Sequence, residues 1–185
     1  MSVKSAVSPV DSSKAFPHQE VDEAFQYYWR LGGAGERWAE FAQLYTPDAI
    51  LIDRVTEGVK QGRGEIRGYL ERVMLTEMPA LYTVYDWHTI EGNTVTNGMI
   101  NRFDNPEPGG APLDFFGVTI QVYAGDGLWS YQEDYYSWMG MMRVRSDYER
   151  LCKVHDPDHP KRRTRDAWPS GPAWAVGQRK HPLGI

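Results

Sequence analysis

Apolar residues in the N-terminal part of the chain recur at three- and four-residue spacing, the period of an amphipathic helix. From Glu20 this spacing places one apolar face on the residues Val21, Ala24, Phe25, Tyr28 and Trp29. A second helical pattern runs from about Glu36 and stops at Pro47. A third begins after Gly62 and ends before Pro79, and residues 49–53 form a short strand-like run between the second and third patterns. The pattern therefore predicts three helices and one early strand.

Beyond Pro79 the period changes to two, and the runs are rich in Val, Ile, Thr and aromatic residues. They cover residues 82–88, 94–103, 115–123 and 129–138. Residues 91–93 and 124–127 are turn signals, while residues 105–112, with three Pro and two Gly, predict a longer loop. Helices followed by an antiparallel meander predict an α+β fold in which a curved sheet wraps the helices.

The chain of 185 residues suits one domain with tails, and 41% hydrophobic and 24% charged residues are ordinary for a globular protein. We expect a leader over residues 1–19 and the α+β domain over residues 20–145. Residues 146–185 are expected to form a short helix and a basic, Pro/Trp-rich tail that packs on the domain or on a second subunit. Residues 151–185 contain seven Lys/Arg and three Asp and so carry a charge of +4. Because the whole chain has a net charge of −5, the first 150 residues carry −9. An acidic body is a poor match to nucleic acid, and no nucleic-acid partner is expected.

Composition narrows the chemistry further. The single cysteine, Cys152, excludes an intramolecular disulfide and a Cys-rich metal site, and we predict neither a metal nor another cofactor. The segment His155–His159 is interpreted as a solvated loop rather than a metal site. No stretch approaches the ~18 apolar residues that span a membrane, and the N-terminus lacks the apolar core of a signal peptide. A cytoplasmic protein without a membrane partner is the expectation.

Three segments resemble the nuclear transport factor 2-like (NTF2-like) superfamily. Residues 45–53 (YTPDAILID) resemble the part of ketosteroid isomerases where helix two gives way to a strand, and residues 62–67 (GRGEIR) resemble the start of the next helix. Residues 126–134 (DGLWSYQED) resemble the last hairpin of SnoaL-like cyclases and limonene-epoxide-hydrolase-like proteins. The resemblance implies a cone of three N-terminal helices against a curved antiparallel sheet, and we expect a homodimer through the sheet face.

The candidate catalytic group with the most specific chemistry is Arg102, Asp104 and Asp134. Arg102 and Asp104 are two apart on one predicted strand and so face the same side of the sheet, and Asp134 lies on the following hairpin. An arginine can hold two carboxylates whose environments split their pKa values, so that one donates a proton and the other activates water. Resemblance to limonene-epoxide-hydrolase-like enzymes assigns Asp104 as acid, Asp134 as base and Arg102 as the bridge. The alternative is an Arg102–carboxylate ion pair that only joins strands.

Asp53 supports a second chemistry. By resemblance it matches the general base of ketosteroid isomerases, and Tyr28 or Tyr27 matches the tyrosine that donates to the oxyanion in that family. A carboxylate among apolar walls is a suitable base for removing a proton beside a carbonyl. The alternative is an Asp53 that caps the turn toward Gly58.

Aromatic residues make up 13% of the chain, and they predict an apolar pocket. The predicted substrate-binding residues are Tyr28, Trp29, Tyr45, Trp87, His88, Phe103, Phe116 and Tyr136. His88 is as compatible with a structural hydrogen bond, and the aromatic–Met run over residues 135–142 could line either a pocket mouth or a dimer surface. We therefore expect a cofactor-independent acid–base enzyme for a small hydrophobic oxygenated molecule (terpenoid, steroid or polyketide-like). Epoxide-hydrolase-like water addition is placed first. Isomerase-, dehydratase- or cyclase-like proton transfer and non-catalytic binding are the alternatives.

Overall fold

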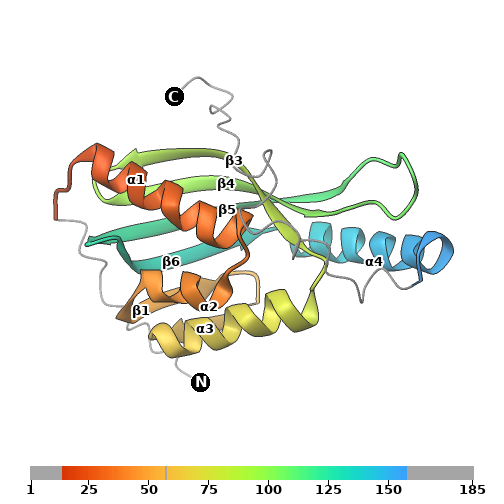
Figure 1. The fold of residues 1–185 in the computed structure, drawn as a ribbon, viewed down its shortest axis with the longest axis horizontal. Helices are drawn as coiled ribbons and strands as arrows, with labels where there is room; N and C mark the ends of the chain where they lie inside the picture. The colour runs from red at the N-terminus through yellow and green to blue at the C-terminus, as the bar shows by residue number, and fades with distance from the viewer. Residues whose placement is uncertain (1–13, 57, 158–185) are drawn as a thin grey trace.

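A computed structural model describes residues 14–56 and 58–157, which form an α+β fold (Figure 1). The helices are α1 (His18–Trp29), α2 (Trp38–Phe41), α3 (Arg63–Arg72) and α4 (Trp138–His155). Short π or 3-10 turns extend three of them: η1 (Arg30–Ala34), η2 (Ala42–Leu44) and η3 (Val73–Glu77). The strands are β1 (Tyr45–Asp53), β2 (Gly58–Gln61), β3 (Tyr82–Glu91), β4 (Thr94–Phe103), β5 (Leu113–Gly125) and β6 (Leu128–Tyr136). Residues 1–13 of the predicted leader and residues 158–185 of the predicted tail lie outside the described residues, and α1 begins at His18, within the range predicted for the leader.

The six strands form one curved sheet in the order β2-β1-β6-β5-β4-β3. All neighbours are antiparallel except β1 and β6, which run parallel and place Asp53 beside Asp134. Helices α1, α2 and α3 cover one face, called the inner face below, and the opposite face is called the outer face (Figure 1). The predicted α+β class with three N-terminal helices against a curved, mostly antiparallel sheet is confirmed.

The main core lies between the helices and the inner face. Helix α1 buries the face that its spacing predicts, with Val21, Phe25, Tyr28 and Trp29 inward. The ring of Tyr28 lies 4.5 Å from that of Phe41 and 5.6 Å from that of Trp129, which joins α1 to α2 and to β6. Large aromatic side chains contribute much of the burial that stabilises a domain of this size.

Helix α4 differs from the prediction in its start. A helix was expected from Ser146 and a strand to Trp138, but the helix begins at Trp138. Ser137 caps it, because its Oγ accepts a hydrogen bond from the backbone N–H of Gly140 at 3.0 Å. The buried residues Met141, Val144, Tyr148 and Cys152 recur at helical spacing, so the signal was present in the sequence. Strand β2 was also not predicted, since four half-exposed residues carry little periodic signal.

A β-bulge changes the alternation along β3. Tyr85 pairs with Met99 and Trp87 pairs with Gly98, so Asp86 is the extra residue between them. Met99 faces the inner side, and its neighbour Gly98 therefore faces outward, as does the Trp87 indole that covers Gly98. The bulge thus moves Trp87 to the outer face.

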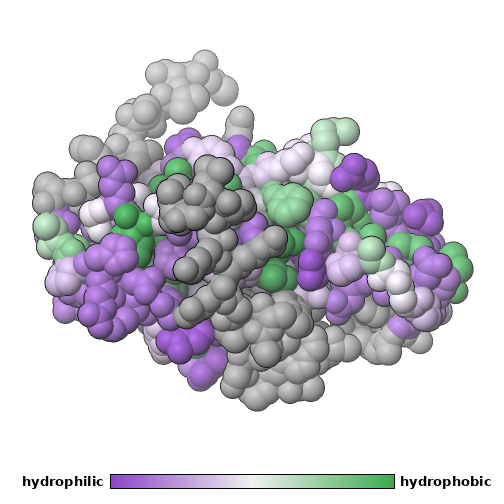
Figure 2. Space-filling view, turned by 90° about the horizontal axis from the view of Figure 1, so that it is seen from above, coloured by the Kyte–Doolittle hydropathy of each residue, from purple (hydrophilic) through white to green (hydrophobic). Residues whose placement is uncertain are grey.

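The surface of the protein carries both hydrophobic and hydrophilic side chains. On the face seen in Figure 2, hydrophobic side chains gather in small patches between hydrophilic ones. In the part of the chain that the structure describes, no helix has the length and hydropathy needed to cross a lipid bilayer.

The contact between Gly98 and Trp87 gives a stability test. A Cβ at residue 98 would overlap Nε1 of Trp87, so Gly98→Ala must displace the indole. We expect the free energy of unfolding to fall by about 1–3 kcal/mol in equilibrium denaturation. Gly68→Ala is the matched control, because residue 68 lies within α3 and a Cβ there meets nothing within 4 Å. The control should raise stability by up to about 1 kcal/mol. Equal stabilities of Gly98→Ala and the wild type would contradict the packing described.

Candidate active site

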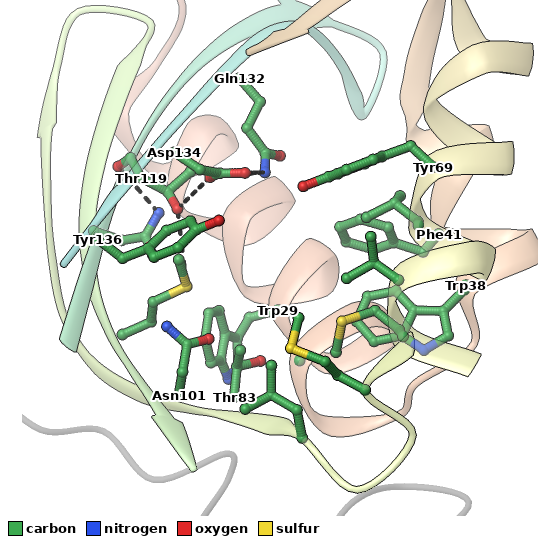
Figure 3. A pocket seen from close by; sticks show the side chains of 18 of the residues that line it. Trp29, Trp38, Phe41, Tyr69, Thr83, Asn101, Thr119, Gln132, Asp134 and Tyr136 are labelled. Carbon is green, nitrogen blue, oxygen red and sulfur yellow. Dashed lines mark hydrogen bonds between the residues drawn. The ribbon is translucent and has the colours of Figure 1, made fainter. Parts of the chain in front are cut away.

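A cavity of about 140 Å³ lies between the helices and the inner face of the sheet (Figure 3). An engineered apolar cavity of about 150 Å³ takes up benzene, so this one suits a body of about one ring. Its apolar walls include aromatic and methionine side chains: Trp29, Trp38, Phe41, Phe115, Met74, Met78, Met99 and Met141. Such a cavity with few polar groups is the usual form of a small-molecule site.

Asp134 is the one charged side chain among the described residues that line the cavity. Its Oδ1 accepts hydrogen bonds from Oγ1 of Thr119 (2.7 Å) and Nε2 of Gln132 (3.0 Å), and its Oδ2 accepts from the same Nε2 (2.9 Å). Burial is the largest of the effects that together raise the pKa of Asp134 to about 6; the hydrogen bonds from Thr119 and Gln132 lower the pKa, and the nearby carboxylates of Asp53 and Glu133 raise it. This pKa lies close to neutral pH, as proton transfer requires.

Gln132 is itself held by two tyrosines. Its Oε1 accepts hydrogen bonds from the hydroxyls of Tyr28 (2.6 Å) and Tyr45. Burial raises the pKa of both hydroxyls, so they remain protonated donors. Because the amide oxygen faces the tyrosines, the amide nitrogen faces Asp134. Figure 3 shows Gln132 and Asp134 side by side at one end of the cavity.

Asp53 lies behind this wall and does not line the cavity. Its Oδ1 accepts from the backbone N–H groups of Val55 (2.9 Å) and Thr56 (3.0 Å), and its Oδ2 accepts from the hydroxyls of Tyr69 and Tyr136 (3.0 Å each). Burial alone would raise the pKa of this carboxyl, but the hydrogen bonds from Thr56, Tyr136 and Val55 outweigh burial and lower it. The carboxylate therefore caps the turn after β1 and positions two tyrosines.

The structure does not bring Arg102 and Asp104 together with Asp134. Arg102 donates two hydrogen bonds to Asp114, from Nε (2.7 Å) and Nη2 (2.6 Å), and Asp104 accepts one from the hydroxyl of Tyr82. The reason is strand alternation, since Asn101 lines the cavity and its neighbour Arg102 faces outward. The expected Asp–Arg–Asp group is thus not assembled, and Arg102 joins β4 to β5 as the alternative interpretation proposed.

Three predicted substrate-binding residues, Tyr28, Trp29 and Tyr136, line the cavity. Tyr45 lies behind Gln132 and acts on the site through it. Phe103 does not line the cavity, because it stacks on Tyr148 of α4 at 4.5 Å.

The remaining three predicted binding residues also lie elsewhere. Phe116 is 66% exposed on the outer face, and the bulge in β3 places Trp87 there as well. His88 joins α1 to β3, with its Nε2 2.8 Å from Asp22 Oδ1 and its Nδ1 2.8 Å from the Tyr85 hydroxyl. Its position agrees with the structural interpretation of this histidine.

Sequence reasoning missed several polar lining residues: Tyr69, Thr83, Asn97, Asn101, Thr119 and Gln132. A usable signal existed, because Asn97 and Asn101 share one strand face, as do Gln132 and Asp134 on β6. In residues 14–56 and 58–157, no group of three or more His, Cys, Asp or Glu side chains is arranged to hold a metal ion.

Comparison with known proteins places the fold. No protein-family model and no curated protein matches the chain. Among solved structures, it resembles a protein described as a SnoaL-like polyketide cyclase from Jannaschia sp. CCS1 (20% identity, TM-score 0.56, 68% of this chain and 91% of that chain). It also resembles a hypothetical protein with a ketosteroid isomerase-like fold from Catenulispora acidiphila, in complex with trimethylamine (16% identity, TM-score 0.53, 69% of this chain and 92% of that chain). A third similar structure is that of SalBIII, an epoxide hydrolase/cyclase-like enzyme (17% identity, TM-score 0.53, 66% of this chain and 94% of that chain). The chain has the NTF2-like fold.

The raised pKa of Asp134 predicts that the stability of the protein depends on pH. The folded-state pKa (about 6) exceeds the ordinary value of 3.8, so folding favours the protonated form. Stability from this group is therefore full below about pH 4 and is lost as the pH rises through 6. We expect Asp134→Asn to gain stability relative to the wild type as the pH rises from 4 to 7, by on the order of 2 kcal/mol. Denaturant titrations at each pH measure the difference, and a difference that does not vary with pH would contradict the assignment.

Asp53 predicts the opposite kind of dependence. Asp53→Ala leaves two backbone N–H groups and two tyrosine hydroxyls without an acceptor, so we expect a loss of about 2–4 kcal/mol at pH 7. Asp53→Asn keeps one acceptor oxygen and should lose less. Because its pKa is lowered, stability from Asp53 is present above about pH 4 and lost as the pH falls below it. An Asp53→Ala variant as stable as the wild type at pH 7 would refute the structural role.

Proposed function

We propose that this protein is a cofactor-independent acid–base catalyst that transfers a proton on a small, hydrophobic, oxygenated molecule. The observation that supports it is Asp134, a lone carboxyl in an apolar cavity with a pKa near 6. At neutral pH such a group is largely ionised, yet it is a stronger base than a solvated aspartate.

The geometry favours Asp134 as the base. Among described residues its Oδ2 accepts only from Gln132, which leaves an oxygen lone pair for a substrate proton. In an isomerase- or cyclase-like step, Asp134 takes a proton from carbon beside a carbonyl and returns it elsewhere on the same molecule. Asp53, by contrast, already accepts four hydrogen bonds and does not line the cavity. The base is therefore assigned to Asp134 rather than to Asp53.

The neighbours of similar fold support this class of function, since their descriptions include a polyketide cyclase and an epoxide hydrolase/cyclase-like enzyme. The complex with trimethylamine supports a small-molecule ligand. Epoxide opening is the second candidate, because the hydroxyls of Tyr69 and Tyr136 line the same cavity as Asp134 and are kept protonated by burial. It is placed second because Arg102 and Asp104 do not join Asp134.

A turnover screen of cyclic enones and epoxides tests the proposal. We expect kcat/KM of the wild type to rise with pH through a limb near pH 6, because the base must be ionised. Asp134→Asn should lower kcat by at least about 100-fold. Asp104→Asn is the matched control, and it should retain activity within about threefold because it removes one carboxylate outside the cavity.

Full activity of Asp134→Asn would refute Asp134 as the base. Loss of activity in Asp104→Asn instead would restore the Asp–Arg–Asp mechanism. Binding of these compounds without turnover would make the protein a small-molecule carrier or sensor.

A further inference from the structure

The cavity contains a second polar site that the proposed reaction does not use. Thr83 on β3 and Asn101 on β4 are register partners, and both line the cavity. Neither side chain makes a hydrogen bond to any described residue, although Asn101 is only 6% exposed. Here the pair is called the Thr83–Asn101 subsite.

The polar atoms of both side chains reach the surface of the cavity, where water or a ligand can pair with them. A ligand that fills the cavity excludes that water, and leaving an amide or hydroxyl unpaired beneath it would cost about 1–3 kcal/mol. An asparagine side chain has two donor hydrogens and an acceptor oxygen, and a threonine hydroxyl both donates and accepts. The subsite can therefore bind a neutral carbonyl or hydroxyl oxygen, whichever the ligand presents.

Glycines make room for both side chains. A Cβ at residue 117 would lie 3.3 Å from Nδ2 of Asn101, and a Cβ at residue 33 would lie 3.1 Å from Oγ1 of Thr83. Both distances are tighter than ordinary contacts. Any larger residue at these two positions would press on the polar atoms of the subsite.

The subsite lies away from Asp134. Thr119 pairs with Asp134 on one side and with Asn97 on the other, so these three form one row across the sheet. Asn101 is four residues further along β4, roughly 13 Å at 3.3 Å per residue, and the curvature of the sheet shortens the gap between side chains. Figure 3 shows Thr83 and Asn101 at one end of the cavity and Gln132, Thr119 and Asp134 at the other. Met99 lies between Asn97 and Asn101 on the inner side of β4, so an apolar side chain separates the two ends.

We propose that the Thr83–Asn101 subsite binds a second oxygen of the substrate, at the end opposite the group that reacts at Asp134. The substrate class is then a body of about one ring with two oxygen functions at opposite ends. The distal oxygen is neutral, since no Lys or Arg is among the described residues that line the cavity and a carboxylate there would be unpaired. This inference rests on the proposed function only in placing the substrate in this cavity.

Calorimetric binding of a matched ligand pair tests the subsite without turnover. 4-Hydroxyacetophenone and 4-isopropylphenol share a phenol, which can donate to Asp134, and differ in the distal carbonyl. The phenol end orients both ligands, because a ketone oxygen facing the Asp134 carboxylate would pair two acceptors. The quantity measured is the ratio of the two dissociation constants in the wild type and in each variant.

Thr83→Val and Asn101→Leu remove the polar atoms at nearly constant size. Each should shift the ratio against the ketone by about 5–10-fold, while the affinity for 4-isopropylphenol changes less than about threefold. Thr96→Val is the matched control, since Thr96 faces the outer side of β4, and it should leave the ratio unchanged.

A ratio that stays within about twofold of wild type in Thr83→Val and Asn101→Leu would overturn the subsite. If Asn101→Leu does not fold, Thr83→Val alone decides. The two proposals fail separately. An unchanged ratio of dissociation constants in the subsite variants refutes the subsite, whereas full activity of Asp134→Asn refutes only the catalytic role.

Discussion

The site depends on the orientation of one buried amide, that of Gln132. The hydroxyls of Tyr28 on α1 and Tyr45 on β1 both donate to its oxygen, and its nitrogen donates to Asp134. A reversed amide would place its oxygen against the carboxylate, so that two acceptors face each other, and it would remove the acceptor of two buried tyrosine hydroxyls. Because the tyrosines come from different elements, the packing of α1 and β1 against β6 determines how Asp134 is held.

The neighbouring carboxylates of Asp53 and Asp134 have opposite environments. Asp53 and Asp134 are register partners in the parallel pair of β1 and β6. Asp53 receives hydrogen bonds from the turn backbone and from two tyrosines, which lower its pKa, while Asp134 faces apolar walls, which raise its pKa. Environments that push the pKa values of two carboxyl groups apart give the two groups different roles. The hydroxyls of Tyr69 and Tyr136 connect the two, since both bind Asp53 and line the cavity with Asp134.

Hydrophobic periodicity predicted most of the fold, except β2 and the start of α4, but it did not predict the site. The period of 3.6 predicted the buried face of α1, and the period of two predicted the meander. Because adjacent residues of a strand face opposite sides, Phe103 and Arg102 cannot both face the cavity, and Arg102 of β4 faces outward. The position of Trp87 depends on a bulge that no local residue pattern signals. Asp134 was selected as the later carboxylate of an Asp–Arg–Asp pattern and by family resemblance, whereas Gln132 and Asn101 matter through contacts made only in three dimensions.

The apolar walls connect reactivity with specificity. They raise the pKa of Asp134 by excluding water, and they also select the body of the ligand. A substitution that admits water would lower this pKa and weaken the base, even where it left room for the substrate. Conversely, a polar substrate would bring its own hydration into the cavity and lose the benefit of the raised pKa. A hydrophobic ring with few, well-separated oxygens satisfies both requirements, because it displaces water from Asp134 while its oxygens pair with the polar groups at the two ends of the cavity.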